Sequence, residues 1–177
     1  MLIKKYTPDW IRHFEALKVE ISKGLEGLQY RIEHIGSTAV PGLGGKDIID
    51  IDIIYDGGKI FHGIQSGLES IGYYHNGNQG IEQREVFKRM EGETHPVLDE
   101  IRHHLYVCPL DSEALQRHLR SRDYLRNNEW ARMKYQKMKH MLAEQAGQDQ
   151  KVYAKLKERH ANEFIDIMVS QEERKNL

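Results

Sequence analysis

The segment Ile48-Ile49-Asp50-Ile51-Asp52-Ile53-Ile54 decides how the rest of the sequence is interpreted. It is rich in β-branched residues, which favour strands, and it is followed by the turn residues Asp56-Gly57-Gly58. Because side chains alternate along a strand, the two aspartates share one face, and Ile49, Ile51 and Ile53 lie on the other. Residues 48–55 therefore predict a strand with one apolar face and one face that carries two carboxylates.

The paired carboxylates suggest a cation site. On one strand face, Asp50 and Asp52 would lie about 7 Å apart, so both can reach one divalent cation. Ile48 and Ile54 share that face and indicate partial burial, where two like charges need a cation, a basic partner or a proton. We therefore expect Mg²⁺ or Mn²⁺ here, serving phosphoryl or nucleotidyl transfer. The alternative is a half-exposed strand whose aspartates are solvated or paired with Arg or Lys.

The residues before this strand suggest a phosphate site. A strand expected at residues 30–35 runs into Gly36, where a phosphate can approach the backbone. Ser37 and Thr38 then supply hydroxyls and amides at a helical turn, and Lys46 precedes the aspartate strand. Each signal alone is that of an ordinary turn. Together with the aspartates they predict nucleotide binding.

Two later strands, expected at residues 84–90 and 101–108 as antiparallel neighbours, carry further candidates. One expectation is a basic wall around a triphosphate, and the alternative is a solvated or salt-bridged sheet face. His104 is expected to act as a base or as a metal ligand beside the two aspartates. The basic candidates are Arg84, Lys88 and Arg102.

Glycine and proline divide the chain into two parts. Of 15 glycines, 14 lie before residue 110, as do all 4 prolines. We expect one domain over residues 1–177, with an α/β portion at 1–109 and a helical portion at 110–177. The expected helices begin near Thr7 and Pro8, at residue 59, at Asp111 or Ser112, and at residues 129 and 149.

Composition limits the functional classes. The net charge is -1 and no apolar stretch approaches the length of a membrane span, so we expect neither a membrane protein nor a nucleic-acid-binding protein. The single cysteine, Cys108, and the lack of a secretory signal favour the cytoplasm. Residues 117–139 carry a local excess of +6. This run fits an RNA surface, a triphosphate clamp or a solvated helix face, and within it Arg122 and Arg126 are the phosphate candidates.

These motifs resemble the GrpB family, also called UPF0157. The resemblance rests on residues 34–43 (His-Ile-Gly-Ser-Thr-Ala-Val-Pro-Gly-Leu), on Lys46 and residues 48–52, and continues through residues 104–107 and 119–126. It implies the nucleotidyltransferase superfamily of the DNA polymerase β type. It also implies an α+β fold, in which a mixed or antiparallel sheet is flanked by helices. By this resemblance, Gly36 with Ser37 binds nucleotide phosphates, and the Asp50 and Asp52 pair holds metal.

One departure from the superfamily concerns the third carboxylate. Active members place it on a later strand, where this sequence offers Arg102, His104 and Tyr106, with Glu85 as a substitute on the preceding strand. Two functions therefore stay open. The first is metal-dependent transfer of a nucleoside monophosphate from a triphosphate to an unknown small-molecule or protein acceptor. The second is an inactive nucleotide-sensing or partner-binding module, since similar domains are fused to dephospho-coenzyme A kinase.

Overall fold

A five-stranded mixed sheet forms the centre of the computed structural model, which describes residues 1–57, 60–92 and 94–175. Its spatial order is β1-β2-β5-β4-β3. The strands are β1 (Arg31–Ile35), β2 (Ile49–Tyr55), β3 (Tyr73–His75), β4 (Glu85–Arg89) and β5 (His103–Pro109). β2 and β5 are parallel, and the other neighbouring pairs are antiparallel. The expected α+β class with a mixed sheet is confirmed.

The strand register places the polar side chains of β2 beside those of β5. Asp50 pairs with His104, and Asp52 pairs with Tyr106. On the other side of β2, Glu33 of β1 lies opposite Asp52. Because facing residues in a sheet share a face, these polar side chains form one surface.

The opposite face of the sheet is the main hydrophobic core. Ile49, Ile51 and Ile53 of β2 are at most 1% exposed there, and they contact α1 (Asp9–Lys23) and α2 (Ile60–Ser70). Trp10, Phe14, Leu17 and Ile21 recur at helical spacing and supply the buried stripe of α1. α1 and α2 therefore fix which face of β2 is left for polar side chains.

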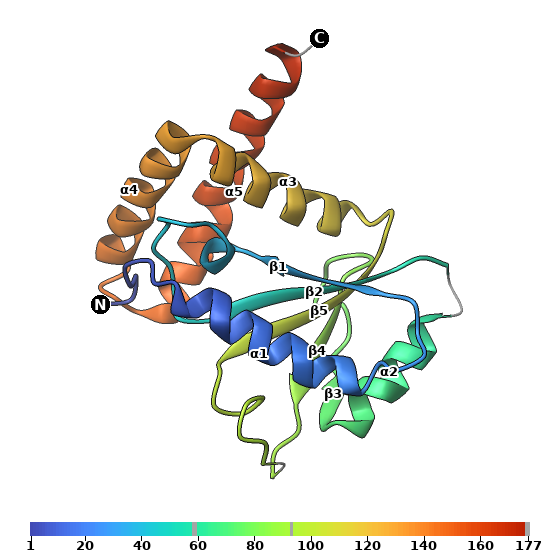
Figure 1. Ribbon diagram of the computed structural model, residues 1–177. Helices are drawn as coiled ribbons and strands as arrows, with labels where there is room; N and C mark the ends of the chain where they lie inside the picture. Colours follow the sequence, from blue (N-terminus) through green and yellow to red (C-terminus); the bar gives the residue numbers. More distant parts are fainter. Residues whose placement is uncertain (58–59, 93, 176–177) are drawn as a thin grey trace.

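The C-terminal helices lie on the polar side of the sheet. They are α3 (Glu113–Asn127), α4 (Glu129–Gln145) and α5 (Gln150–Lys175), and Figure 1 shows them gathered away from α1 and α2. Leu115 of α3 packs on Ile54 and Cys108 of the sheet. Between residues 36 and 48, the chain forms the short 3₁₀ turn η1 (Ser37–Ala39) and then passes beneath α4.

Most sequence-predicted elements occur within two or three residues of their expected bounds. Ser112 caps α3 by accepting a hydrogen bond from the backbone N–H of Leu115. β3 was not expected, because its three residues are too short to show an alternation. No helix in the described part of the chain is long and apolar enough to cross a membrane.

Candidate functional site

The first component of the candidate site is a contact between a glycine turn, an aspartate and a histidine. His104 Nδ1 lies 2.8 Å from Asp50 Oδ1, within hydrogen-bonding distance. Burial alone would raise the pKa of Asp50, but the hydrogen bond and charge of His104 outweigh it and leave this pKa below its usual value. A β-carbon on Gly36 would lie 2.3 Å from Asp50 Oδ2, so only glycine leaves room for this carboxylate.

The second aspartate is held in a different environment. Asp52 is fully buried, and its Oδ2 lies 2.8 Å from Nδ1 of His118, a residue of α3. The thiol of Cys108 approaches Oδ1 at 4.0 Å. Burial raises the pKa of Asp52 despite its contact with His118. Both carboxylate oxygens therefore face protein groups.

Aromatic and basic side chains connect the two aspartate–histidine pairs. The Tyr106 ring centroid lies 6.2 Å from that of His104 and 5.8 Å from that of His118. Arg84 stacks on the same ring at 4.8 Å. Its Nε atom is buried and has no hydrogen-bond partner among the described residues. This leaves an unused donor beside the pairs.

A buried lysine lies under the glycine–serine turn. Lys139 of α4 is 1% exposed, and its Nζ lies 2.8 Å from Ser37 Oγ while also donating to the backbone carbonyl of Gly44. No carboxylate of the described residues forms an ion pair with it. Burial, reinforced by the charge of Lys157, lowers the pKa of Lys139 well below its usual value.

Further cations surround the same turn. Burial, together with the nearby charges of Lys157 and Arg102, lowers the pKa of Lys46, and only Asp50 opposes this shift. Lys157 of α5 is half-buried, and its pKa is raised, chiefly by Tyr135 and then by Asp50. We call Lys46, Lys139 and Lys157 the lysine cluster. Lys46 and Lys157 both lie near Asp50, whose single negative charge leaves an excess of positive charge at the turn.

The described residues do not form a preorganised metal centre. No group of three or more His, Cys, Asp or Glu side chains among them converges as ligands would. Asp50 is hydrogen-bonded to His104, and Asp52 is enclosed by His118 and Cys108. One oxygen of Asp50 and both oxygens of Asp52 therefore already contact protein groups.

Several predicted nucleotide ligands have other contacts. Thr38 is 1% exposed, and its hydroxyl contacts His34 and the Ile48 carbonyl. Arg122 forms hydrogen bonds with Glu33, Asp123 and the His34 carbonyl. These side chains therefore form intramolecular hydrogen bonds at the edge of β1.

Arg126 also lies at the edge of β1, where it donates to the Ala39 carbonyl and lines a cavity of about 420 Å³ against Phe14. Lys88 is exposed on β4, the second strand from β2. Of the predicted ligands, the structure brings together those at the turn and at the adjacent ends of β2 and β5. They are Gly36, Ser37, Lys46, Asp50, Arg102 and His104.

The substitute for a third carboxylate lies on the wrong face. Glu85 pairs in register with Val107, which belongs to the core beneath α1 and α2, and its carboxylate contacts His75 at 2.6 Å. The expectation that Glu85 supplements the aspartates is therefore wrong, because neighbouring positions of a strand alternate between faces. Glu33 shares the face of Asp52 but is held by Arg122.

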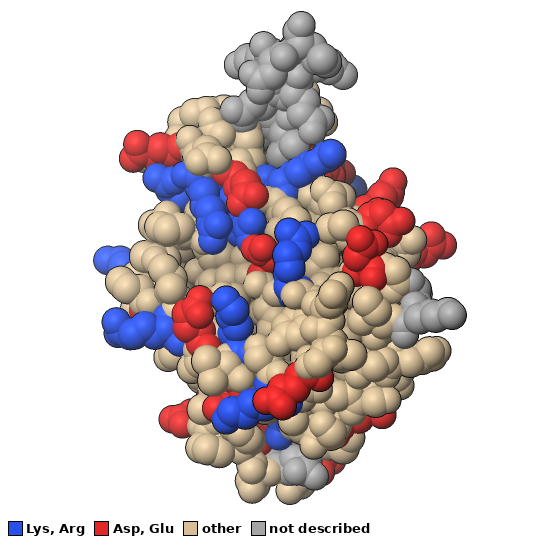
Figure 2. All heavy atoms as spheres, turned by 45° about the vertical axis from the view of Figure 1, so that its right-hand side comes forward, with Lys and Arg blue, Asp and Glu red and all other residues tan. Residues whose placement is uncertain are grey.

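The basic run at residues 117–139 is divided among separate contacts. Arg117 pairs with Asp166 of α5, Arg132 donates to backbone carbonyls, and Lys139 is buried. On the face that Figure 2 presents, Lys and Arg side chains are interspersed with Asp and Glu. Charges of both signs are therefore mixed on that face.

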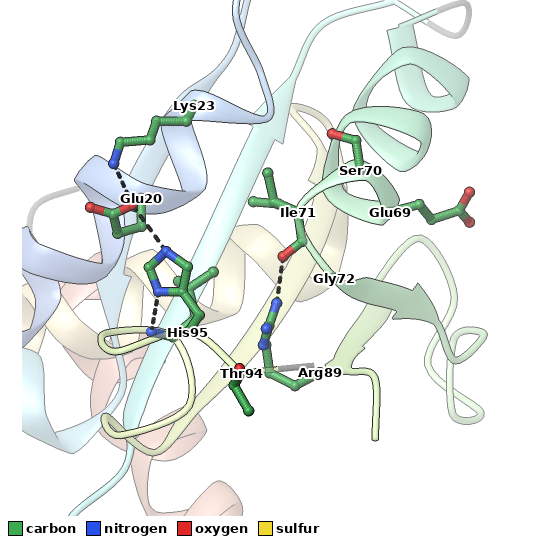
Figure 3. A pocket seen from close by; sticks show the side chains of 10 residues that line it. Glu20, Lys23, Glu69, Ser70, Ile71, Gly72, Arg89, Thr94 and His95 are labelled. Carbon is green, nitrogen blue, oxygen red and sulfur yellow. Dashed lines mark hydrogen bonds and ion pairs between the residues drawn. The ribbon is translucent and has the colours of Figure 1, made fainter. Parts of the chain in front are cut away.

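A second cavity, of about 270 Å³, lies away from the aspartates. Figure 3 shows it between the end of α1, the turn before β3 and the loop that carries His95. Glu20 pairs with Lys23 and His95, and Arg89 donates to the Ile71 carbonyl and pairs with Asp99. Glu20, Lys23 and Arg89 of its lining are therefore paired within the protein, while Glu69 accepts a hydrogen bond from Gln65.

Sequence reasoning missed His118, Lys139 and Lys157. Each lies on a C-terminal helix, far along the chain from the residue that it approaches. The apolar pattern of α4 gave one usable signal, since Tyr135, Lys139 and Leu142 are buried on one helix face.

Comparison with known proteins gives concordant results. A family model described as "GrpB protein" matches residues 1–170. A UPF0157 protein of Pseudomonas aeruginosa is 35% identical over 154 residues, which are 85% of this chain but 60% of that longer protein. The glutamate-rich protein GrpB of Alkalihalophilus pseudofirmus is 28% identical and covers 95% of both chains.

A solved structure supports the architecture. The crystal structure of a conserved protein GrpB from Enterococcus faecalis aligns with a TM-score of 0.76 at 26% sequence identity. The alignment covers 96% of this chain and 98% of the other. The arrangement of sheet and helices described above is therefore shared with a known protein.

Proposed function

This chain belongs to the GrpB family, and we propose that it binds the phosphate groups of a nucleoside triphosphate at the turn formed by Gly36 and Ser37. The observation that carries the proposal is the positive charge of Lys46 and Lys157, which lies at that turn with a single carboxylate, Asp50, nearby. The unused donor of Arg84 lies on the same face of the sheet and supports it.

The proposed role is nucleotide sensing or partner regulation. Turnover by the superfamily mechanism needs carboxylates that are free to hold metal, whereas Asp52 is enclosed and the strand that follows offers His104 and Tyr106 in place of an acid. Mg²⁺ or Mn²⁺ would then arrive with the nucleotide phosphates rather than occupy a preformed site.

Nucleotidyl transfer is the second candidate. It is favoured by the position of Asp50, which shares a face with Asp52 and touches the Gly36 turn, as the nucleotidyltransferase superfamily requires. The acceptor would be a small molecule or a protein. Release of pyrophosphate in the presence of Mn²⁺ and a broad set of acceptors would favour this candidate over sensing.

Isothermal titration calorimetry with ATP and the other nucleoside triphosphates, in Mg²⁺ or in EDTA, tests the proposal. Each lysine contact with phosphate is worth about 1.5–3 kcal/mol, so we expect Lys46→Gln and Lys157→Gln each to weaken binding by about tenfold or more. Lys137→Gln is the matched control, because this lysine is exposed on α4. The proposal fails if wild-type protein binds no nucleotide, or if all three variants bind alike.

A further inference from the structure

The contact between Ser37 and Lys139 has a chemical meaning beyond phosphate binding. Their Oγ and Nζ atoms are 2.8 Å apart, although 102 positions separate the residues along the chain. Ser37 is partly exposed at the start of η1, whereas Lys139 is 1% exposed beneath it. The hydroxyl therefore faces solvent on one side and a buried amine on the other.

Two glycines allow the amine to come this close. A β-carbon on Gly45 would lie 3.0 Å from Ser37 Cβ and 3.7 Å from Lys139 Nζ. A β-carbon on Gly44 would lie 3.0 Å from the side-chain Nε2 of Gln136, a residue of α4. The bare backbone of residues 44 and 45 thus lets α4 approach the turn, and the Gly44 carbonyl accepts a hydrogen bond from Nζ.

Burial is the main influence on the charge of Lys139 and lowers its pKa. The charge of Lys157 also disfavours the ammonium form, whereas Asp50 and the Tyr135 ring, whose centroid lies 5.4 Å from Nζ, favour it. A neutral amine can donate one hydrogen to the Gly44 carbonyl and direct its lone pair at the Ser37 hydroxyl, which is the arrangement of a general base.

We propose that Ser37 is a nucleophile, activated by Lys139, that accepts a phosphoryl group from an anionic phosphate ester or anhydride. Ser37 Oγ forms the new bond to phosphorus, Lys139 Nζ takes the hydroxyl proton, and the leaving oxygen departs with the electron pair of the broken P–O bond. Lys46, Lys157 and Arg102 supply positive charge for the phosphoryl oxygens. A serine with a lysine base is an established form of activated nucleophile.

Labelling with a fluorophosphonate tests this reactivity without reference to nucleotide binding. In that reaction Ser37 Oγ replaces fluoride on phosphorus, and peptide mass spectrometry locates the adduct. We expect the full chain to be labelled at Ser37 in preference to its other serines. The labelling rate should reach a plateau at a pH well below the usual lysine pKa of 10.5, because the amine is already neutral there.

Variants of Lys139 distinguish a role as general base from a purely structural role. Lys139→Met removes the base at similar volume, and Lys139→Arg keeps a charge that does not deprotonate, so both should slow labelling about a hundredfold or more. Lys137→Met, at an exposed position of the same helix, should label like wild type. Circular dichroism identifies any variant that is unfolded. If one Lys139 variant is unfolded, the labelling rate of the other Lys139 variant tests the role of the base.

Two results would overturn the proposal. The first is Ser37 labelling no faster than the remaining serines. The second is unchanged labelling in a folded Lys139 variant. Inorganic pyrophosphate should slow the labelling by binding at the lysine cluster. An unchanged labelling rate would overturn the proposal that the phosphoryl donor is an anionic phosphate ester or anhydride. Nucleotide binding without labelling would leave the proposed function intact and remove only the nucleophile.

Discussion

Replacing Gly36 with alanine should destabilise the protein by about 3 kcal/mol, through two separable effects. Gly36 has φ 71° and ψ −167°, a region that is essentially restricted to glycine, and entering it with a side chain costs about 1–3 kcal/mol. The new β-carbon would also lie 2.3 Å from Asp50 Oδ2, so the carboxylate must retreat and loosen its hydrogen bond to His104. A hydrogen bond to a charged group is worth about 1.5–3 kcal/mol.

Urea and thermal unfolding measure this loss, which corresponds to a melting temperature lower by about 6–12 °C in a domain of this size. A double-mutant cycle isolates the contact: Gly36→Ala should cost at least about 1 kcal/mol less in an Asp50→Ala background. Gly27→Ala is the reference, because Gly27 has φ 79° but open space around it. Additive costs in the cycle, or equal costs at Gly36 and Gly27, would refute this account of the turn.

Three further predictions concern buried charge. Burial lowers the pKa of His34 to about 4, so stability should fall by about 3 kcal/mol as pH drops from 6.5 to 4, and His34→Phe should remove this dependence in urea titrations at each pH. Burial raises the pKa of Asp52, so its ionisation disfavours the folded state as pH rises above 3.8. Asp52→Asn should remove this loss, so that stability rises more steeply with pH over the acid range than in the wild type, and an unchanged slope would contradict it. Arg122→Met should cost about 1.5–3 kcal/mol in chemical unfolding, because the buried guanidinium loses its hydrogen bonds with Glu33, Asp123 and the His34 carbonyl. Arg117→Met removes an exposed ion pair on the same helix and should cost less than about 1 kcal/mol.

Most helices and strands were predictable because each depends on the pattern of apolar and polar residues within its own short segment. Alternation along residues 48–54 identified β2 and its two faces, and the apolar spacing from Trp10 to Ile21 identified α1. β3 was not predicted because three residues are too few to show an alternation of apolar and polar side chains. The antiparallel pairing of β4 and β5 was also expected and is confirmed.

The candidate site was predictable only where its residues adjoin a recognisable motif. Gly36, Ser37 and Asp50 belong to one stretch of chain, so a sequence pattern brings them together. His118, Lys139 and Lys157 reach the site through helix docking, which no short pattern encodes. Arg122 and Arg126 stay predictions from their spacing. In the structure Arg122 forms hydrogen bonds with Glu33 and Asp123, and Arg126 donates through Nε to the Ala39 carbonyl.

The parallel register of β2 and β5 implies a specific tolerance to insertions and deletions. Loops that join the strands can gain or lose residues without altering which side chains meet across the sheet. A single residue inserted within β5 before His104 would exchange the two faces of that strand. Leu105 would then lie opposite Asp52 and Val107 opposite Ile54, while His104 and Tyr106 would enter the apolar layer beneath α1. Variation in length among related chains should accordingly be confined to the connections, and this strand should keep a constant length.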